Sequence, residues 1–276
     1  MNRTVIPRVA AKQCVIPGLP KGAEAIHAVD AEGRRFYAKT QGCPNTHLHN
    51  PTWIANELIY YVIARESCLP MPEAAVLEIN GQLCWGSEVL NGRNRIPTPQ
   101  AARILREVCQ ESKDELLGLA RALLLDLALL NSDRKPSNML VSRWGDGRPK
   151  LWYFDHDKSL LGDGLECKDL ARIDPASVTD SKVSDYFACV EANDLVFDGL
   201  SDKEICGIMG DLALNDDALA LAREQCPGEW LSEALFSRLE GFLRSWWGFV
   251  HGRLKAANPK FYLGQLLRER CLLSSR

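Results

Sequence analysis

The sequence predicts an α+β chain with two lobes, a smaller strand-rich lobe followed by a larger helical one. Two observations predict it: strand-like alternation with tight turns fills residues 1–92, and apolar helical patterns dominate residues 93–276. The character changes at the turn-rich segment "NGRNRIPTP" (91–99). A chain of 276 residues can bury a substantial core. We expect ligands to bind in the cleft between the two lobes.

Two hairpins are predicted in the first lobe. Residues 23–29 and 35–40 alternate in hydrophobicity and are joined by the turn "DAEG". Residues 73–90 form a second hairpin around an Asn-Gly turn, because Asn-Gly readily adopts the backbone angles of a two-residue hairpin loop. The Gly/Pro-rich segment "PGLPKGA" (17–23) is predicted to be a loop.

The helices follow from longer apolar patterns. Residues 50–67 read as a helix with Thr52 as its N-cap. Residues 100–130 read as helical, and the leucine crowding in the second half predicts a helix at the centre of a core. Three further helical stretches are predicted in the last third of the chain: 202–214, 216–225 and 228–257.

Composition excludes several classes of protein. A formal net charge of −3 gives no global basic field, so we expect no nucleic acid partner. The most apolar stretch, residues 116–130, is too short to span a bilayer and contains Arg121 and Asp126. The N-terminus lacks the apolar core of an export signal, and the ten cysteines contain no CxxC pair. We therefore expect a cytoplasmic protein with reduced thiols.

Three polar residues follow the leucine-rich helix in a pattern that can carry chemistry. Asp133 and Asn138 lie five residues apart in a loop, and a returning strand ends at Asp155. A carboxylate and an amide oxygen suit Mg²⁺, and a second carboxylate can accept a hydroxyl proton. Kinases use this set for phosphoryl transfer. Taken singly, these residues are more commonly a turn cap, a loop residue and a strand end.

Two upstream residues favour the catalytic interpretation. Phosphoryl transfer in kinases also needs a strand lysine for the nucleotide phosphates and a helix glutamate that holds it. Lys39 ends the second strand of the first hairpin, and Glu57 borders the apolar stripe of the following helix. A surface lysine and a solvated glutamate are each the commoner outcome. All five polar residues occur in the order that a kinase requires.

With these motifs, the chain resembles the HipA-like kinase family, which is related to the phosphoinositide lipid kinases and to the protein kinases. The resemblance covers about residues 20–165. The segments that carry it are "NSDRKPSN" (131–138), "FDHD" (154–157), "YAKT" (37–40), the pair Asn56-Glu57, and "WGSEVL" (85–90) as the hinge. It implies a two-lobed protein-kinase-like fold, with residues 1–92 as the N-lobe and 93–276 as the C-lobe. It also favours a bacterial protein.

The resemblance assigns roles to the nucleotide-binding residues. Lys39 would hold the α- and β-phosphates of ATP, and Glu57 would orient Lys39. The backbone of Glu88, Val89 and Leu90 would meet adenine, and Lys21 in the 17–23 loop could reach a phosphate. This loop lacks a G-x-G-x-x-G pattern.

The resemblance also assigns the catalytic and metal-binding residues. Asp133 would be the catalytic base, while Asn138 and Asp155 would bind Mg²⁺. The chain departs from the family at Asp157, where the family has glycine after the Asp-His pair. This residue adds a negative charge near the metal site.

The function predicted is ATP- and Mg²⁺-dependent transfer of the γ-phosphoryl group to a hydroxyl acceptor, with a protein serine or threonine favoured. Two alternatives remain open. One is a catalytically weak, pseudokinase-like binding module of a toxin–antitoxin-like pair, which would have a partner protein. The other is a nucleotidyl transferase that adds AMP on the same fold.

Overall fold

The computed structural model describes most of the chain. The described residues are 4–14, 26–40, 53–90, 94–95, 100–131, 134, 138–143, 147–156, 159–160, 196, 198–212, 214 and 216–256. They form helices and two separate sheets, so the predicted α+β class is confirmed.

The larger sheet is a closed barrel of five strands in the order β1-β2-β3-β5-β4. Its strands are β1 (Arg8–Cys14), β2 (Ile26–Asp30), β3 (Arg35–Lys39), β4 (Ala74–Ile79) and β5 (Gln82–Glu88). Closure removes the unpaired edges that an open sheet would expose. A small cluster that includes Phe36 and Leu77 fills the interior.

Both predicted hairpins are confirmed. In the β4–β5 turn, Asn80 and Gly81 have φ angles of 53° and 77°, which is the left-handed conformation that this turn requires. In the β2–β3 turn, the Asp30 carboxylate accepts hydrogen bonds from the backbone N–H groups of Glu32 and Arg34, at 3.0 and 2.8 Å. Local turn chemistry therefore sets the register that places Lys39 at the end of β3, opposite Trp85.

Strand β1 was missed by the sequence analysis. It pairs antiparallel with β2 and parallel with β4, and this parallel pair closes the barrel. Its sequence, "RVAAKQC", is rich in residues that strands disfavour, and its side chains are mostly exposed. The strand is held by its neighbours on both sides and not by its own propensity.

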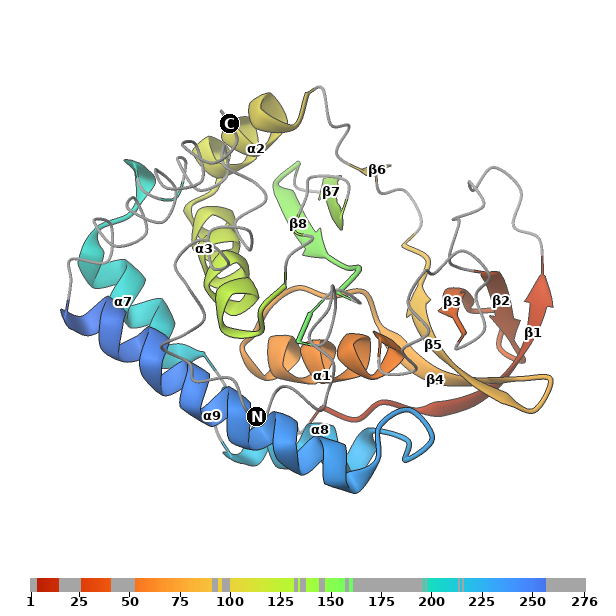
Figure 1. Ribbon diagram of the computed structural model, residues 1–276. Coiled ribbons are helices and arrows are strands. Elements are labelled where there is room, and N and C mark those ends of the chain that lie inside the picture. The colour runs from red at the N-terminus through yellow and green to blue at the C-terminus, as the bar shows by residue number, and fades with distance from the viewer. Residues whose placement is uncertain are drawn as a thin grey trace, which may run out of the picture.

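Helix α1 (Trp53–Glu66) is buried on every side from Trp53 to Ala64. An all-round buried helix must be covered by several elements. Figure 1 shows α1 at the centre of the fold, with the barrel to one side and α8 and α9 below it. This position lets α1 present polar side chains to both the barrel and the helical part.

The predicted helix over residues 100–130 is two helices, α2 (Ala101–Glu111) and α3 (Lys113–Ala128). The break falls at Ser112, whose side chain accepts a hydrogen bond from the Glu115 N–H and caps α3. The sequence Ser-x-x-Glu is a helix-start pattern that could have located this break. As predicted, α3 is buried along most of its length.

The second sheet has three strands in the order β6-β7-β8: β6 (Asn94–Arg95), β7 (Met139–Arg143) and β8 (Pro149–Tyr153). The returning strand predicted before Asp155 is β8, which pairs antiparallel with β7, whereas the short strand β6 was not foreseen. Helix α3 packs on β8, so the start of β7 and the end of β8 lie beside the central helices.

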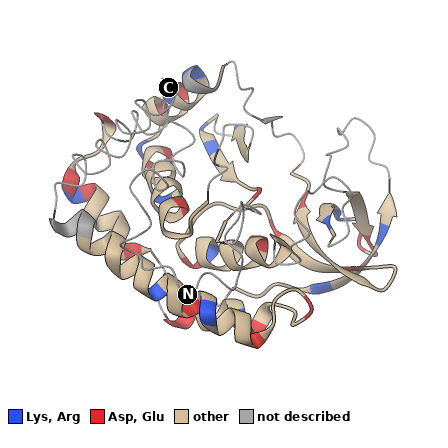
Figure 2. Ribbon diagram, in the orientation of Figure 1, with Lys and Arg blue, Asp and Glu red and all other residues tan. Residues whose placement is uncertain are grey.

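The predicted C-terminal helices are confirmed, the middle one with the predicted ends and the other two shorter than predicted. They are α7 (Asp202–Asp211), α8 (Asp216–Gln225) and α9 (Glu233–Ala256). The indole N–H of Trp246 on α9 donates to the Leu127 carbonyl of α3 at 3.1 Å, which ties the two helices together. Figure 2 shows acidic and basic residues interspersed along these helices. Among the described residues, none of the helices is long and apolar enough to cross a membrane.

Two glycines should respond to alanine in opposite directions. A Cβ at Gly86 on β5 would lie 2.6 Å from the Leu77 side chain, which is fully buried and has little room to move. We expect Gly86→Ala to lower the free energy of unfolding by about 1–3 kcal/mol. Gly207 lies on the open face of α7 with nothing near its Cβ position, and Gly207→Ala should add roughly 0.5–1 kcal/mol. Chemical denaturation measures both, and equal stability of the two variants would contradict the packing of the barrel.

Candidate active site

The structure brings three of the predicted site residues into contact. The Lys39 ammonium, at the end of β3, lies 2.5 Å from Glu57 Oε1 on α1 and 2.5 Å from Asp155 Oδ1, two residues after β8. The side chains of Lys39 and Glu57 are 13% and 4% exposed, and that of Asp155 is 31% exposed. One cation thus lies between two carboxylates. The cluster carries one net negative charge at a position that is still partly open to solvent.

Glu57 joins the two sides of this cluster. Its Oε1 accepts from the Lys39 ammonium, and its Oε2 accepts from the His156 backbone N–H at 3.1 Å. A carboxylate buried in a helix core is costly unless its oxygens are paired and hydrogen-bonded. The same ammonium lies 5.7 Å from the centre of the Trp53 ring, one turn earlier on α1. Helix α1 therefore fixes both the lysine and the backbone after Asp155.

Asp155 has an unusual backbone conformation. Its φ angle is 63°, in the left-handed region that costs a non-glycine residue roughly 1–2 kcal/mol but that Asp and Asn tolerate best. Hydrogen bonds on either side hold it there: Phe154 N–H donates to the Asn138 carbonyl at 3.3 Å, and His156 N–H donates to Glu57. The left-handed residue turns the chain sharply at the end of β8, where its carboxylate meets Lys39.

Next to the cluster lies a fully buried ion pair, whose arginine also donates to the carbonyl of Phe154, the residue before Asp155. The Arg134 guanidinium donates to both oxygens of Asp126 on α3, through Nε at 2.7 Å and Nη2 at 3.0 Å, and both side chains are 0% exposed. Asp126 Oδ1 also accepts from Tyr60 Oη and from Asn131 Nδ2, each at 2.7 Å. Burial opposes the charge of Arg134, but the Asp126 carboxylate raises its pKa above the ordinary value. Arg134 therefore keeps its positive charge despite its burial.

His156 connects this ion pair to α1. Its ring stacks on Tyr60 with centroids 3.8 Å apart and planes 4° apart, and its Nδ1 lies 2.9 Å from Arg134 Nη2. A guanidinium only donates, so Nδ1 accepts and the imidazole is neutral. Burial, and then the positive charge of Arg134, lower the pKa of His156 well below its usual value. The ring therefore serves as a neutral packing and hydrogen-bonding group.

The remaining predicted residues fall into two groups. Asn138 is buried, 3% exposed, immediately before β7, and its backbone pairs with Phe154, next to Asp155. The structure thus places Asn138 and Asp155 on neighbouring strand ends. Asp133, Lys21 and Asp157 lie outside the described residues.

The predicted adenine-binding segment is partly engaged with the protein itself. Glu88 N–H donates to the Glu73 carbonyl and Val89 N–H donates to the Arg35 carbonyl, both at 2.8 Å. Glu88 is the last residue of β5, so the first four residues of the predicted hinge (85–88) belong to the barrel. Two of the three backbone N–H groups in this segment are therefore already bonded within the protein. Contacts from this segment would come from carbonyl groups and from Leu90.

Asp126 and Tyr60 of the buried network were missed as site residues by the sequence analysis, and Arg134 and Asn131 were noted only as part of the "NSDRKPSN" motif. Asp126 lies within "LLLDLALL", where a lone carboxylate in an apolar helix predicts a buried partner. That pattern, eight residues before Arg134, could have revealed the pair. Tyr60 could not have been found in this way, because a tyrosine on an apolar helix is ordinary core.

The donor set suits a hard divalent cation of the Mg²⁺ type. Among the described residues, no group of three or more His, Cys, Asp or Glu side chains gathers as a metal cage. Mg²⁺ does not need one, because it is commonly held by one or two protein oxygens and completes its shell with phosphate and water. An amide oxygen from Asn138 and a carboxylate from Asp155 at neighbouring strand ends fit this chemistry.

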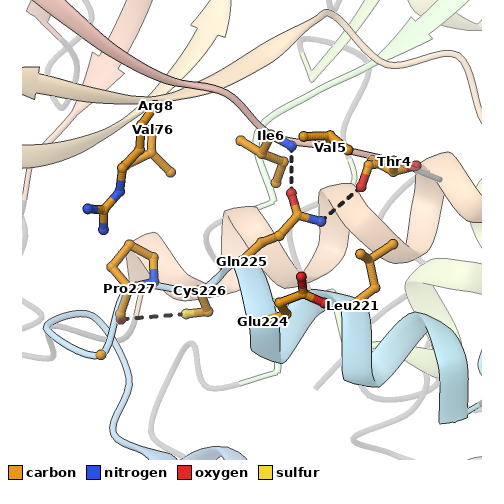
Figure 3. A pocket seen from close by; sticks show the side chains of 11 residues that line it. Thr4, Val5, Ile6, Arg8, Val76, Leu221, Glu224, Gln225, Cys226 and Pro227 are labelled. Carbon is orange, nitrogen blue, oxygen red and sulfur yellow. Dashed lines mark hydrogen bonds between the residues drawn. The ribbon is translucent and has the colours of Figure 1, made fainter.

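A pocket of about 500 Å³ lies elsewhere, between the N-terminal segment and α8. Figure 3 shows the Gln225 side chain reaching from α8 to the extended backbone of this segment. Its amide accepts from the Ile6 N–H at 2.5 Å and donates to the Thr4 carbonyl at 2.9 Å. None of the predicted site residues lines this pocket. It marks where the N-terminal segment is tied to the helices.

Comparison with solved structures shows that the chain has a kinase-like fold. The structure of the Helicobacter pylori proinflammatory kinase CtkA aligns with a TM-score of 0.52 over 91% of this chain and 99% of that chain. The sequence identity is 12%, so the likeness concerns the fold alone.

Other comparisons add little. An aminoglycoside phosphotransferase from Alicyclobacillus acidocaldarius subsp. acidocaldarius DSM 446 aligns over 86% of this chain and 92% of that chain at 12% identity. Its TM-score of 0.29 is too low to show a shared fold. No protein-family model matches the chain. No curated protein matches it in sequence.

The buried ion pair should dominate stability around the site. Arg134→Met leaves the Asp126 carboxylate buried without its charge partner, and we expect a loss of about 3–5 kcal/mol in the free energy of unfolding. Tyr60→Phe removes one hydrogen bond to the same carboxylate and should cost roughly 1.5–3 kcal/mol. Arg103, whose partner Glu107 lies with it on the exposed face of α2, provides the control. Chemical denaturation of Arg134→Met, Tyr60→Phe and Arg103→Met measures their order of stability. An Arg134→Met variant as stable as Arg103→Met would show that the pair is not buried.

Proposed function

We propose that the chain is an ATP- and Mg²⁺-dependent phosphotransferase that moves the γ-phosphoryl group to a hydroxyl acceptor. The observation that carries this proposal is the contact of Lys39 with both Glu57 and Asp155 on a kinase-like fold. These residues come from a barrel strand, a central helix and the end of a second hairpin. Stability alone gives no reason for three ionisable groups to meet there, since buried ion pairs seldom add net stability.

In this proposal Lys39 contacts the α- and β-phosphates, and Glu57 keeps the ammonium in position. The cluster carries one net negative charge, which opposes an unaccompanied polyphosphate and favours a nucleotide that arrives with a divalent cation. Lys21, in the 17–23 loop, is a second candidate for a phosphate contact. Adenine would lie against the backbone of residues 88–90, mainly at carbonyl groups and Leu90.

The metal ligands in the proposed site are Asn138 and Asp155. When bound, Mg²⁺ neutralises charge on the phosphate oxygens. The residues of the chain orient the reactants: Lys39 aligns the phosphates, and the left-handed turn at Asp155 directs its carboxylate towards them. Positioning of this kind accounts for most of catalysis in phosphoryl transfer.

Asp133 is the proposed catalytic base, by the position it holds in the Asp-x4-Asn run. The acceptor hydroxyl oxygen forms a bond to the γ-phosphorus while the bond from that phosphorus to the β,γ-bridging oxygen breaks. The hydroxyl proton passes to the Asp133 carboxylate, and ADP leaves. Nucleotide, metal, acceptor and base account for all the atoms and charges of this step.

The finer proposals follow from the resemblance to HipA-like kinases. The acceptor is a protein serine or threonine, and residues 1–92 and 93–276 act as two lobes that meet at the nucleotide. Lys39 and Glu57 belong to the first of these segments and Asp155 to the second, so the observed contacts cross the proposed boundary.

Substitutions at the Lys39–Glu57 pair should change nucleotide binding without unfolding the protein. Lys39→Met removes the phosphate contact, so ATP affinity measured by calorimetry should fall about 10-fold or more, the usual effect of losing a charged hydrogen bond. Glu57→Gln keeps the shape but frees the ammonium, so turnover should fall more than affinity.

Lys113→Met is the matched control, because Lys113 pairs with Glu204 on an exposed surface. It should bind ATP like the wild type. If Lys39→Met and Glu57→Gln both bind and turn over ATP as well as Lys113→Met does, the three-residue cluster is not a nucleotide site.

Substitutions at the two aspartates should separate chemistry from metal binding. Asp133→Ala should abolish transfer of label from γ-labelled ATP while leaving ATP affinity within about twofold, because a base acts mainly on the chemical step. Asp155→Asn, which tolerates the same left-handed backbone, should lose the Mg²⁺-dependent part of ATP binding.

The mass of the modified acceptor separates the remaining alternatives. An added phosphoryl group supports the proposal, and an added AMP identifies a nucleotidyl transferase. A wild-type protein that binds Mg-ATP but labels no acceptor, whether a protein or a small molecule, would favour a pseudokinase-like binding module.

A further inference from the structure

We propose that Arg134 is a positioning residue that sets the spacing of the two metal ligands, Asn138 and Asp155. The inference rests on the proposed function, since it concerns the metal site of that function. Neither the Asp-x4-Asn spacing nor the kinase-like fold assigns this role to the arginine.

The key contacts come from a single nitrogen of the guanidinium. Arg134 Nη1 donates to the carbonyl oxygen of Asn138 at 3.3 Å and to that of Phe154 at 3.3 Å. Asn138 carries one proposed ligand, and Phe154 immediately precedes the other. One nitrogen atom therefore bridges the backbones of the two segments that carry the ligands. Together with the Phe154–Asn138 backbone bond, it fixes how far apart the segments lie.

The rest of the guanidinium is held rigidly. Its Nε and Nη2 grip Asp126 in a two-point contact, and Nη2 also lies 2.9 Å from His156 Nδ1 and 3.3 Å from Tyr60 Oη. These partners come from α3, the segment after β8, and α1. A planar group fixed by several bonds in a fully buried place cannot rotate without losing them. Its position is therefore set by the helices and imposed on the two strand ends.

A positioning role can be distinguished from a purely stabilising one. Replacing a buried ion pair by apolar side chains of similar size is often neutral or favourable for stability. Such a replacement keeps the fold but removes the nitrogen that bridges Asn138 and Phe154. If the arginine only stabilised the protein, a stable apolar variant would bind metal normally.

The choice of cation gives a second way to distinguish a positioning role of Arg134 from a purely stabilising one. Mg²⁺ needs near-ideal octahedral geometry with oxygens at about 2.0–2.1 Å, whereas Ca²⁺ accepts irregular shells at about 2.3–2.6 Å. Loosened ligand spacing should therefore weaken Mg²⁺ more than Ca²⁺. A general loss of structure would weaken both cations alike.

The experiment uses the full chain with Tyr60→Phe, Asp126→Leu and Arg134→Met combined, so that the charge pair and its hydroxyl partner are removed together. ATP affinity is measured by calorimetry in EDTA, in Mg²⁺ and in Ca²⁺, beside the wild type. Thermal unfolding establishes that the variant is folded. Arg103→Met is the control for loss of a surface arginine.

We expect the combined variant to lose mainly the gain in ATP affinity that Mg²⁺ gives. ATP affinity in EDTA stays within about twofold of the wild type, while the gain in affinity from Mg²⁺ falls about 10-fold or more, the usual effect of losing a partner that orients metal ligands. The gain from Ca²⁺ falls less. A folded variant that keeps the full Mg²⁺ gain, or loses both gains equally, overturns the inference. A wild type that shows no metal-dependent gain contradicts the proposed function itself, and the inference with it.

Arg134→Lys decides the question if the combined variant does not fold. Lysine keeps a positive charge for Asp126 but lacks the planar fork that reaches two sets of acceptors. The same selective loss of the Mg²⁺ gain is expected, to a smaller degree. An unchanged ratio of the Mg²⁺ and Ca²⁺ gains in this variant overturns the positioning role.

Discussion

A single buried carboxylate, Glu57, joins the parts of this fold that the proposed chemistry needs. One of its oxygens meets the lysine of β3, and the other meets the backbone just after Asp155. Helix α1 can place it there because the helix is buried on all sides and has little freedom to shift. A charge in such a place is tolerated only with partners on both oxygens. The barrel, the central helix and the second hairpin are therefore aligned by one side chain.

A second group of polar residues packs beside the Lys39–Glu57–Asp155 cluster. Arg134 and Asp126 are fully buried, and the stack of Tyr60 on His156 connects this pair to α1, which also carries Glu57. Glu57 and Tyr60 are three residues apart and so face the same side of their helix. A movement of α1 would disturb the lysine contact and the arginine network together. The Lys39–Glu57–Asp155 cluster is partly open to solvent, as a binding site must be. The Arg134–Asp126 pair is closed to solvent, as a rigid support must be.

Local sequence patterns predicted much of this arrangement. They did not predict the features that depend on contacts between distant segments. The Asn80-Gly81 turn and the alternation around it located a hairpin. The residues predicted for the nucleotide and metal site included Lys39, Glu57 and Asp155, which meet in the structure. Strand β1 was missed because its residues disfavour strands and only its neighbours hold it. The hydrogen-bond acceptors of Arg134 include groups on α1, α3 and the segment after β8. Their meeting could not be predicted from residue spacing, because these segments are far apart in the sequence.

The central claim is that the Lys39 cluster binds a nucleotide together with Mg²⁺. A crystal structure of the full chain with Mg²⁺ and a non-hydrolysable ATP analogue tests it most directly. The predicted result has phosphate oxygens within hydrogen-bonding distance of Lys39 Nζ, and a Mg²⁺ ion about 2.1 Å from oxygens of Asn138 and Asp155. The claim is contradicted if the nucleotide binds elsewhere, such as in the pocket beside Gln225, while Lys39 keeps both carboxylates and no ion lies between Asn138 and Asp155.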